Sequence, residues 1–373
     1  MTGAAIDVVV GLARGDFTLD VAVSVRPGTV TALVGPTGAG KTLLINCLAG
    51  RDHPDRGRIV IGSLAVFDSD RRSRVPAARR PVAVVTAGAR APQRRQGADI
   101  PGVKDAPEGS VAAQVIARLQ LAPLLAMPAA TLAPWQWRQL ALGGALVSGR
   151  PVILVDGLTE GLEPGPRDRL RAIAASLRGL GPTILYACHD VREAARVAED
   201  AILLEDGRVA ASGTVTALSQ SPADHHHFAD AGCVTEGRVC GKDLVSGLIE
   251  LKVGSGIVRA AASAGIGQRL RIRLDPLQVT IAPADSAART ARDGMPGVVR
   301  SLMPHPSGDL DVGIACGDVL VWSRQPQAVA EALALRPGSP VRALATAAEV
   351  LGPSTDAPPV WRPRQGSNLQ PSA

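Results

Sequence analysis

The chain has 373 residues, of which 46% are hydrophobic and 20% are charged, and this composition is that of a globular protein. The formal net charge is +6, but the basic residues are scattered along the chain, so we expect no nucleic-acid partner. The N-terminus does not show the pattern of a secretory leader, and no apolar stretch is long enough to span a bilayer. We therefore expect a cytoplasmic protein.

The first predicted elements are a strand at residues 6–10 and a second strand at residues 29–34, both apolar and β-branched. The second strand leads through a glycine-rich loop into an apolar helix at residues 43–49. The loop is Gly35-Pro36-Thr37-Gly38-Ala39-Gly40-Lys41-Thr42. It meets the pattern G-x-x-x-x-G-K-S/T in full, and its glycines allow backbone N–H groups to point at phosphate oxygens. We expect Lys41 to reach the β and γ phosphates of ATP and Thr42 to bind Mg²⁺.

Two further strands are predicted at residues 151–155 and 183–188, with a helix at residues 167–178 between them. Strands that alternate with helices indicate a largely parallel sheet covered on both faces. Asp156 ends the first of these strands, where a carboxylate can hold Mg²⁺ through water, and the alternative is a plain aspartate at a turn. His189 ends the second, where its ring would contact the γ-phosphate or the attacking water.

The rest of the chain divides into weaker patterns. Residues 201–204 and 208–211 predict a hairpin around an Asp-Gly turn. Residues 68–107, rich in Arg, Pro, Ala and Gly, predict a mostly irregular surface segment. The polar stretch after Ser219 contains His225, His226 and His227, which we interpret as solvated and not as metal ligands.

Short β-type runs separated by turn residues predict a small β-barrel in the C-terminal part of the chain. They are residues 248–253, 269–274, 278–281, 297–302, 309–315 and 318–322. The predicted domains are residues 1–222, residues 223–352, and a tail of residues 353–373 that lacks enough apolar content to fold alone.

The phosphate loop, Asp156 and His189, in this order, resemble ATP-binding-cassette (ABC) ATPases, the nucleotide-binding subunits of transporters, over about residues 6–220. Residues 269–279 resemble the strand before the oxyanion module of molybdate importer ATPases. Arg289 falls in the Ser-x-Arg-Asn run of that module, whose Ser and Asn positions are Ala287 and Thr290 here. The resemblance implies an α/β fold: a P-loop NTPase cassette followed by a small β-barrel of the OB type.

The same resemblance implies the function and the partners. ATP and Mg²⁺ would be the cofactors, and import of molybdate or a related oxyanion would be the task. The partners would be a membrane permease and a second cassette, in a homodimer or a heterodimer. The chain would then lie at the inner face of the cell membrane, and Arg289 would be one donor to an oxyanion in the C-terminal domain.

Within the cassette, three positions depart from the family pattern. The glutamine that senses the γ-phosphate is replaced by Thr86, and the signature Leu-Ser-Gly-Gly-Gln reads Leu-Ala-Pro-Trp-Gln at residues 132–136. The position of the general-base glutamate is Gly157, and the register places no other carboxylate there, since Glu160 and Glu163 lie in the following loop. Loss of a base slows hydrolysis by about 10²–10⁴-fold.

These departures leave three interpretations open. The first is a transporter ATPase. The second is a hydrolysis-deficient nucleotide-binding regulator, which works beside an intact cassette in a heterodimer or senses oxyanion through its barrel. The third is a decaying gene product, suggested by residues 364–371, which have no pattern of a fold. Phe17 is a candidate for stacking on adenine, with a plain core position as the alternative.

Overall fold

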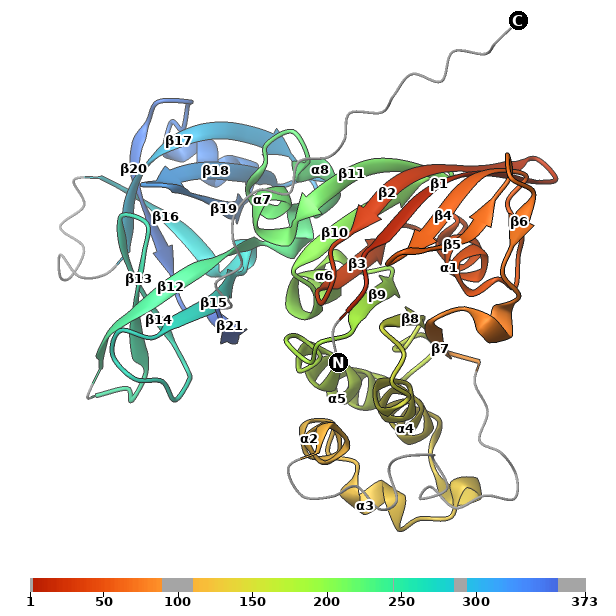
Figure 1. The fold of residues 1–373 in the computed structure, drawn as a ribbon. Helices are drawn as coiled ribbons and strands as arrows, with labels where there is room; N and C mark the ends of the chain where they lie inside the picture. Colours follow the sequence, from red (N-terminus) through yellow and green to blue (C-terminus); the bar gives the residue numbers. More distant parts are fainter. Residues whose placement is uncertain (1–2, 89–109, 244, 285–293, 355–373) are drawn as a thin grey trace, which may run out of the picture. The chain divides into compact units, whose positions relative to one another are not determined.

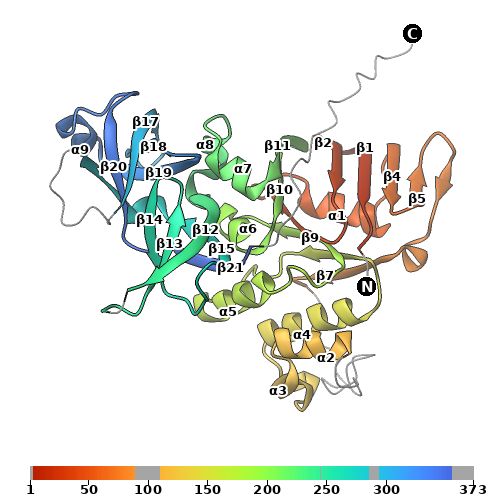
Figure 2. The ribbon, with the colours of Figure 1, turned by 60° about the vertical axis from the view of Figure 1, so that its left-hand side comes forward.

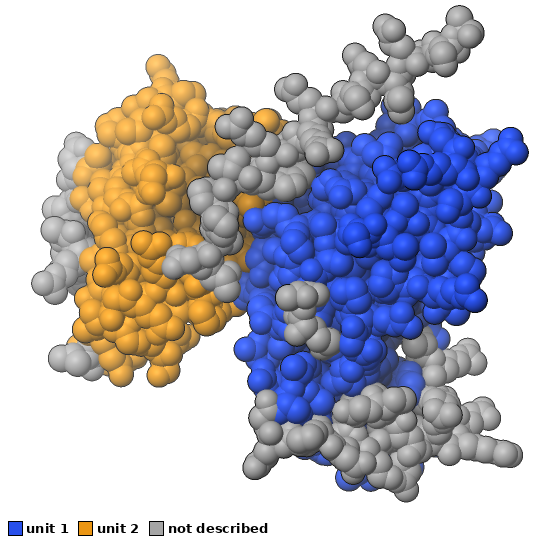
Figure 3. Space-filling view, viewed as in Figure 1, with its two compact units in different colours: residues 1–213, 360–373 blue, residues 214–359 orange. Residues whose placement is uncertain are grey.

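The computed structural model describes residues 3–88, 110–243, 245–284 and 294–354 (Figure 1). They form two compact units that meet in sequence between Gly213 and Thr214, coloured separately in Figure 3. Unit 1 is the N-terminal one and unit 2 the C-terminal one. In the described ranges, every helix is too short or too polar to cross a bilayer.

A six-stranded sheet with the order β11-β10-β3-β9-β8-β7 forms the centre of unit 1. Its strands are β3 (Val30–Val34), β7 (Val82–Thr86), β8 (Val152–Asp156), β9 (Thr183–Cys188), β10 (Asp200–Glu205) and β11 (Arg208–Thr214). All neighbours from β10 to β7 pair in parallel. Every residue of β3 and β9 is buried, which confirms the predicted α/β fold with a covered parallel sheet.

A second, antiparallel sheet with the order β2-β1-β4-β5-β6 also belongs to unit 1. Its strands are β1 (Ile6–Arg14), β2 (Phe17–Val25), β4 (Arg56–Ile61), β5 (Leu64–Asp68) and β6 (Ser73–Arg74). In the first half of β1, from Ile6 to Val10, buried side chains alternate with exposed ones, as in a strand with one face on a core. Helix α1 (Lys41–Ala49) shares one apolar core with this sheet and with the central one, through Leu44, Ile45 and Leu48.

The expectation of an irregular segment at residues 68–107 is wrong for residues 82–86. These residues form β7, an edge strand of the central sheet whose Thr86 lies opposite Asp156 of β8. The run Val-Ala-Val-Val has the apolar, β-branched character of a strand, and its pairing with β8 outweighs the breakers around it. The part of the prediction on residues 89–107 lies outside the described residues.

Helices cover the central sheet and form a lobe beside it. They are α2 (Val111–Arg118), α3 (Ala122–Leu125), α4 (Pro134–Val147), α5 (Pro164–Ala175) and α6 (Val191–Val197). Figures 1 and 2 both place α2 beside α4. Gln139 of α4 donates from Nε2 to the Leu119 carbonyl at 2.6 Å, and Gly143 allows Leu121 to approach, since a Cβ there would lie 2.4 Å from the Leu121 side chain.

Unit 2 consists of two five-stranded antiparallel sheets, with the orders β14-β13-β12-β15-β21 and β16-β20-β17-β18-β19. The first has β12 (Cys233–Lys242), β13 (Ile249–Val253), β14 (Gly256–Ala260), β15 (Arg269–Leu274) and β21 (Glu349–Pro353). The second has β16 (Val279–Pro283), β17 (Met295–Pro304), β18 (Leu310–Cys316), β19 (Val319–Gln325) and β20 (Pro340–Ala345). The short helices of this unit are α7 (Val215–Gln220), α8 (His225–Phe228) and α9 (Gln327–Ala332).

The second sheet of unit 2 curls until its two edge strands meet. Ser323 and Gln325 of β19 both donate from their side chains to the carbonyl of Val279, the first residue of β16. The backbone pairing of the described residues does not close into a ring of strands. The C-terminal unit is thus the small antiparallel β-structure that the sequence predicts, with edges joined through side chains.

The interpretation of His225 as a solvated residue is wrong, although His226 is exposed. The His225 ring is 4% exposed, stacks on Trp322 with ring centroids 3.6 Å apart, and places Nε2 2.9 Å from Asp311 Oδ2. Arg324 donates to the other Asp311 oxygen at 2.8 Å. Burial alone would raise the pKa of Asp311, but the hydrogen bonds from His225 and Arg324 outweigh it and lower that pKa. The Trp322 ring and the Asp311 carboxylate, which stabilise the buried His225, are about 90 residues away in sequence, so the local sequence does not reveal them.

We expect Asp311→Ala to destabilise unit 2 by about 3–5 kcal/mol, because the Arg324 charge and the His225 ring lose their buried acceptor. Asp311 contributes stability above the unfolded-state pKa of about 3.9, and this contribution is lost as the pH falls through the lowered folded-state pKa. Urea unfolding followed by hydrogen exchange of β18 measures the change. Asp318→Ala, at an exposed turn position, is the control, and equal stability of the two variants would contradict the expectation.

Candidate nucleotide site

The phosphate loop connects β3 to α1, and its glycines are required by the backbone. Gly38 and Gly40 have φ values of +86° and +100°, a region that L side chains rarely adopt. A Cβ at Gly35 would lie 2.2 Å from the Leu204 carbonyl oxygen of β10. The loop therefore packs closely on the neighbouring strand and turns sharply into the N-terminus of α1, whose N–H groups are free to face an anion.

Lys41 is the first residue of α1 and lies folded over this loop. Its side chain is 6% exposed, and Nζ donates to the carbonyls of Gly35 at 2.7 Å and Pro36 at 2.9 Å. Nζ also lies 3.0 Å from His189 Nδ1. Burial lowers the pKa of Lys41. Two neutral carbonyl oxygens thus accept hydrogen bonds from the ammonium group at the loop.

Asp156 and Thr42 adjoin each other at the end of the loop. Burial raises the pKa of Asp156, and a hydrogen bond from the Thr42 side chain opposes that rise. Strand β9 lies between β3 and β8 in the sheet, so His189, which follows β9, lies at the same edge of the sheet as the phosphate loop and Asp156. The structure therefore brings together Lys41, Thr42, Asp156 and His189, which the sequence singles out at four separate places.

Glu160, which the sequence register places in the loop after the site, also lies in the site. The carboxylate of Glu160 contacts His189 Nε2 through Oε1. A Cβ at Gly157 would lie 2.6 Å from Glu160 Oε2, so this carboxylate occupies the space beside the position that lacks a side chain. In the sequence, Glu160 is marked only by the two glycines that flank its loop, Gly157 and Gly161. In the structure both glycines have a φ of +66°, which allows the loop to turn tightly.

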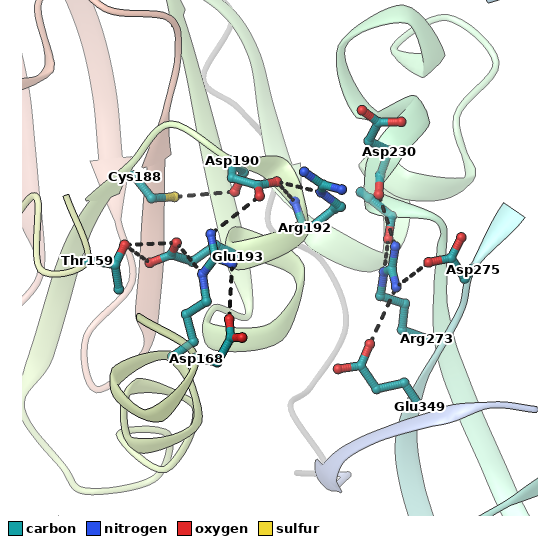
Figure 4. A network of polar contacts seen from close by, with 12 residues as sticks. Thr159, Asp168, Cys188, Asp190, Arg192, Glu193, Asp230, Arg273, Asp275 and Glu349 are labelled. Atoms are coloured by element: carbon teal, nitrogen blue, oxygen red, sulfur yellow. Dashed lines mark hydrogen bonds and ion pairs between the residues drawn. The ribbon is translucent and has the colours of Figure 1, made fainter. Parts of the chain in front are cut away.

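A buried polar cluster lies behind this loop (Figure 4). Thr159 donates from Oγ1 to the carboxylate of Glu193 on α6 at 3.0 Å, and Glu193 is 2% exposed. Tyr186 of β9 and Arg171 of α5 donate to the same carboxylate, at 2.5 and 2.9 Å. Burial raises the pKa of Tyr186 well above its usual value, and the negative charge of Glu193 adds to the rise. The loop that carries Glu160 is therefore bonded to α6 through Thr159, and Glu193 connects it further to β9 and α5.

The model of the ABC transporter family matches residues 19–160. The molybdenum import ATP-binding protein ModC of Rhizobium meliloti is 30% identical over 344 residues, which cover 89% of this chain and 96% of that protein. The protein of the same name from Paramagnetospirillum magneticum is 31% identical, with 89% and 93% covered. This chain belongs to that ABC family. A nucleotide-free ATP-binding cassette of an ABC transporter is 21% identical over 57% of this chain and 91% of that one, with a TM-score of 0.46.

The segment at the ABC signature position, residues 132–136, begins helix α4. Ala133 is the N-cap, and its N–H donates to Gln136 Oε1 at 2.9 Å. Pro134 follows and has no N–H to offer a phosphate. Trp135 is half-buried, and the Arg169 guanidinium lies 5.6 Å from the centre of its ring. The segment thus starts a helix, with a proline and a half-buried indole in its first turn.

Phe17 lies at the edge of a hollow of about 690 Å³ in unit 1. The hollow is lined by Asp16, Phe17, Thr18, Glu205, Asp206, Arg208 and Ala210. A Cβ at Gly40 would lie 3.0 Å from Phe17 Cζ, so the ring adjoins the phosphate loop.

Proposed function

We infer that this chain is the ATP-binding subunit of an ABC importer, with molybdate or a related oxyanion as the cargo. The observation that carries this inference is the complete phosphate loop with Lys41, Thr42, Asp156 and His189 gathered around it. The near full-length match to molybdenum import ATP-binding proteins supports the cargo. A permease and a second cassette are the partners of such a subunit, and the chain then lies at the inner face of the membrane.

The residues of the site fit MgATP. The loop from Gly35 to Thr42 and the N-terminus of α1 would bind the phosphates, and Lys41 would exchange its two carbonyl acceptors for phosphate oxygens. The Thr42 hydroxyl and the Asp156 carboxylate are the hard oxygen donors that Mg²⁺ prefers, and they already adjoin each other. Mg²⁺ neutralises charge on the β and γ oxygens when it is bound. His189 would contact the γ-phosphate.

The altered signature bears on the partner. Residues 132–136 offer a phosphate no N–H donor at Pro134, and the side chain of Trp135 restricts its approach. A heterodimer with an intact cassette would supply normal signature donors to the site of this chain, whereas a homodimer would not. Mass measurement of the complex purified with its permease distinguishes the two.

Oxyanion binding by the C-terminal unit is a separate proposal. Arg289, its proposed donor, lies outside the described residues, so the proposal depends on the sequence resemblance alone. Equilibrium dialysis of the full chain with molybdate tests it, with Arg289→Ala as the variant expected to bind less.

We expect Phe17→Ala to weaken MgATP binding about 5–10-fold, because stacking of an aromatic side chain on a base contributes about 1–3 kcal/mol. A titration with a fluorescent ATP analogue measures this change. Phe67→Ala is unsuitable as a control because that ring is buried in the core, so Thr18→Ala, beside Phe17 in the same hollow, is used instead. An unchanged affinity in Phe17→Ala would assign that ring to the core and not to adenine.

A further inference from the structure

The carboxylate of Glu160 lies where a side chain from residue 157 would otherwise be. One of its oxygens is 2.6 Å from the ideal Cβ position of Gly157, and the other contacts Nε2 of His189. Residue 157 directly follows Asp156 at the end of β8. The Glu160 carboxylate therefore lies at the edge of the sheet where the phosphate loop begins after β3. A carboxylate three residues further along the chain thus occupies the place left by the missing side chain.

The position of Glu160 is fixed by its own loop. Its N–H donates to the Gly157 carbonyl at 3.1 Å, which closes a turn that begins at a residue with φ of +66°. The buried guanidinium of Arg138 donates from Nη1 to the carbonyls of Leu158 at 2.9 Å and Glu160 at 2.6 Å. The neighbouring Thr159 is bonded to buried Glu193. The backbone of Glu160 is therefore held from both sides.

The side chain of Glu160, in contrast, is accessible. It is 47% exposed and that of His189 is 39% exposed, so water and a phosphate can reach both. The two groups form a row with Lys41, since His189 contacts Glu160 through one ring nitrogen and Lys41 through the other. The carboxylate is thus separated by one imidazole ring from the ammonium group that would bind the γ-phosphate.

We propose that Glu160 is the residue that orients and deprotonates the water attacking the γ-phosphate of ATP, in place of a glutamate at position 157. The proposal rests on the proposed function, because it needs ATP at the phosphate loop. The water oxygen bonds to the γ-phosphorus, and the bond from that phosphorus to the bridging oxygen breaks. ADP leaves with the electron pair of that bond, and the Glu160 carboxylate receives the water proton. His189 holds Oε1 of Glu160 through Nε2, and its Nδ1 is left for the γ-phosphate once Lys41 has moved to the phosphates.

Hydrolysis by Glu160→Gln tests this proposal, with Glu163→Gln as the matched control. Glutamine keeps the shape of the side chain but cannot take a proton, and Glu163 is an exposed carboxylate three residues further along the chain, outside the row of Glu160, His189 and Lys41. Steady-state turnover is measured for the full chain, alone and in complex with its permease. We expect kcat to fall about 100-fold or more in Glu160→Gln and to stay within about twofold of the wild-type value in Glu163→Gln.

A binding measurement gives a second readout that does not depend on turnover. If Glu160 faces the γ-phosphate, removal of its charge strengthens the binding of ATP relative to ADP by about threefold or more, whereas Glu163→Gln leaves that ratio unchanged. Three results would overturn the proposal: an unchanged ratio of ATP to ADP affinity in Glu160→Gln, equal turnover of Glu160→Gln and wild type, or no turnover by the wild type. If the wild-type chain does not bind nucleotide at all, the proposed function is overturned instead.

Discussion

Replacement of Lys41 by alanine is expected to weaken MgATP binding about 100-fold and to abolish any hydrolysis by the chain. The Lys41 ammonium is nearly buried and is held by the carbonyls of Gly35 and Pro36, which are neutral acceptors. Charged phosphate oxygens are stronger acceptors, and hydrogen bonds between charged groups contribute about 1.5–3 kcal/mol each. A loss of about 2.8 kcal/mol corresponds to the expected factor.

The measurement is a titration of the full chain with a fluorescent ATP analogue. Lys252→Ala is the control, because Lys252 is an exposed residue of β13 in unit 2 and removes the same charge elsewhere. Equal affinities of Lys41→Ala and wild type would mean that nucleotide, if it binds, does not use the phosphate loop.

Asp156→Asn is expected to remove the dependence of ATP affinity on Mg²⁺ and to lower turnover about 10³-fold. The Asp156 carboxylate adjoins the Thr42 hydroxyl, and the two are the oxygen donors that the site offers to the metal. An amide keeps the shape but not the charge, so the metal is bound weakly and the charge that develops on the phosphates is not neutralised.

Paired titrations with ATP in Mg²⁺ and in EDTA measure this effect. The wild-type chain should bind more tightly in Mg²⁺, and Asp156→Asn should bind equally in both. Asp168→Asn, on the exposed side of α5, should behave like the wild type. A metal dependence that survives in Asp156→Asn would assign Mg²⁺ to other ligands.

The main parts of the site could be predicted from the sequence because their signals are local. The loop from Gly35 to Thr42 is a contiguous pattern with its own backbone requirements, and the buried strands before Asp156 and His189 are apolar throughout. The carboxyl ends of parallel strands meet at one edge of a sheet. Residues that directly follow three such strands in the sequence can therefore be predicted to lie close together.

What the sequence did not reveal depends on contacts between distant segments. Strand β7 is stabilised by pairing with β8, about 70 residues away along the chain. The Arg and Pro residues that flank β7 are typical of irregular segments, so the sequence alone did not predict the strand. Glu160 reaches the site because Arg138 and Glu193, on two different helices, hold its loop. His225 is buried because β18 and β19 supply Asp311 and Trp322. None of these partners is near in sequence.

The central claim is that this chain binds MgATP at its phosphate loop, and calorimetric titration of the purified full chain with ATP tests it most directly. The account predicts saturable binding at about one site per chain, weakened when EDTA removes Mg²⁺ and competed by ADP. The absence of saturable ATP binding in the presence of Mg²⁺ would contradict the account.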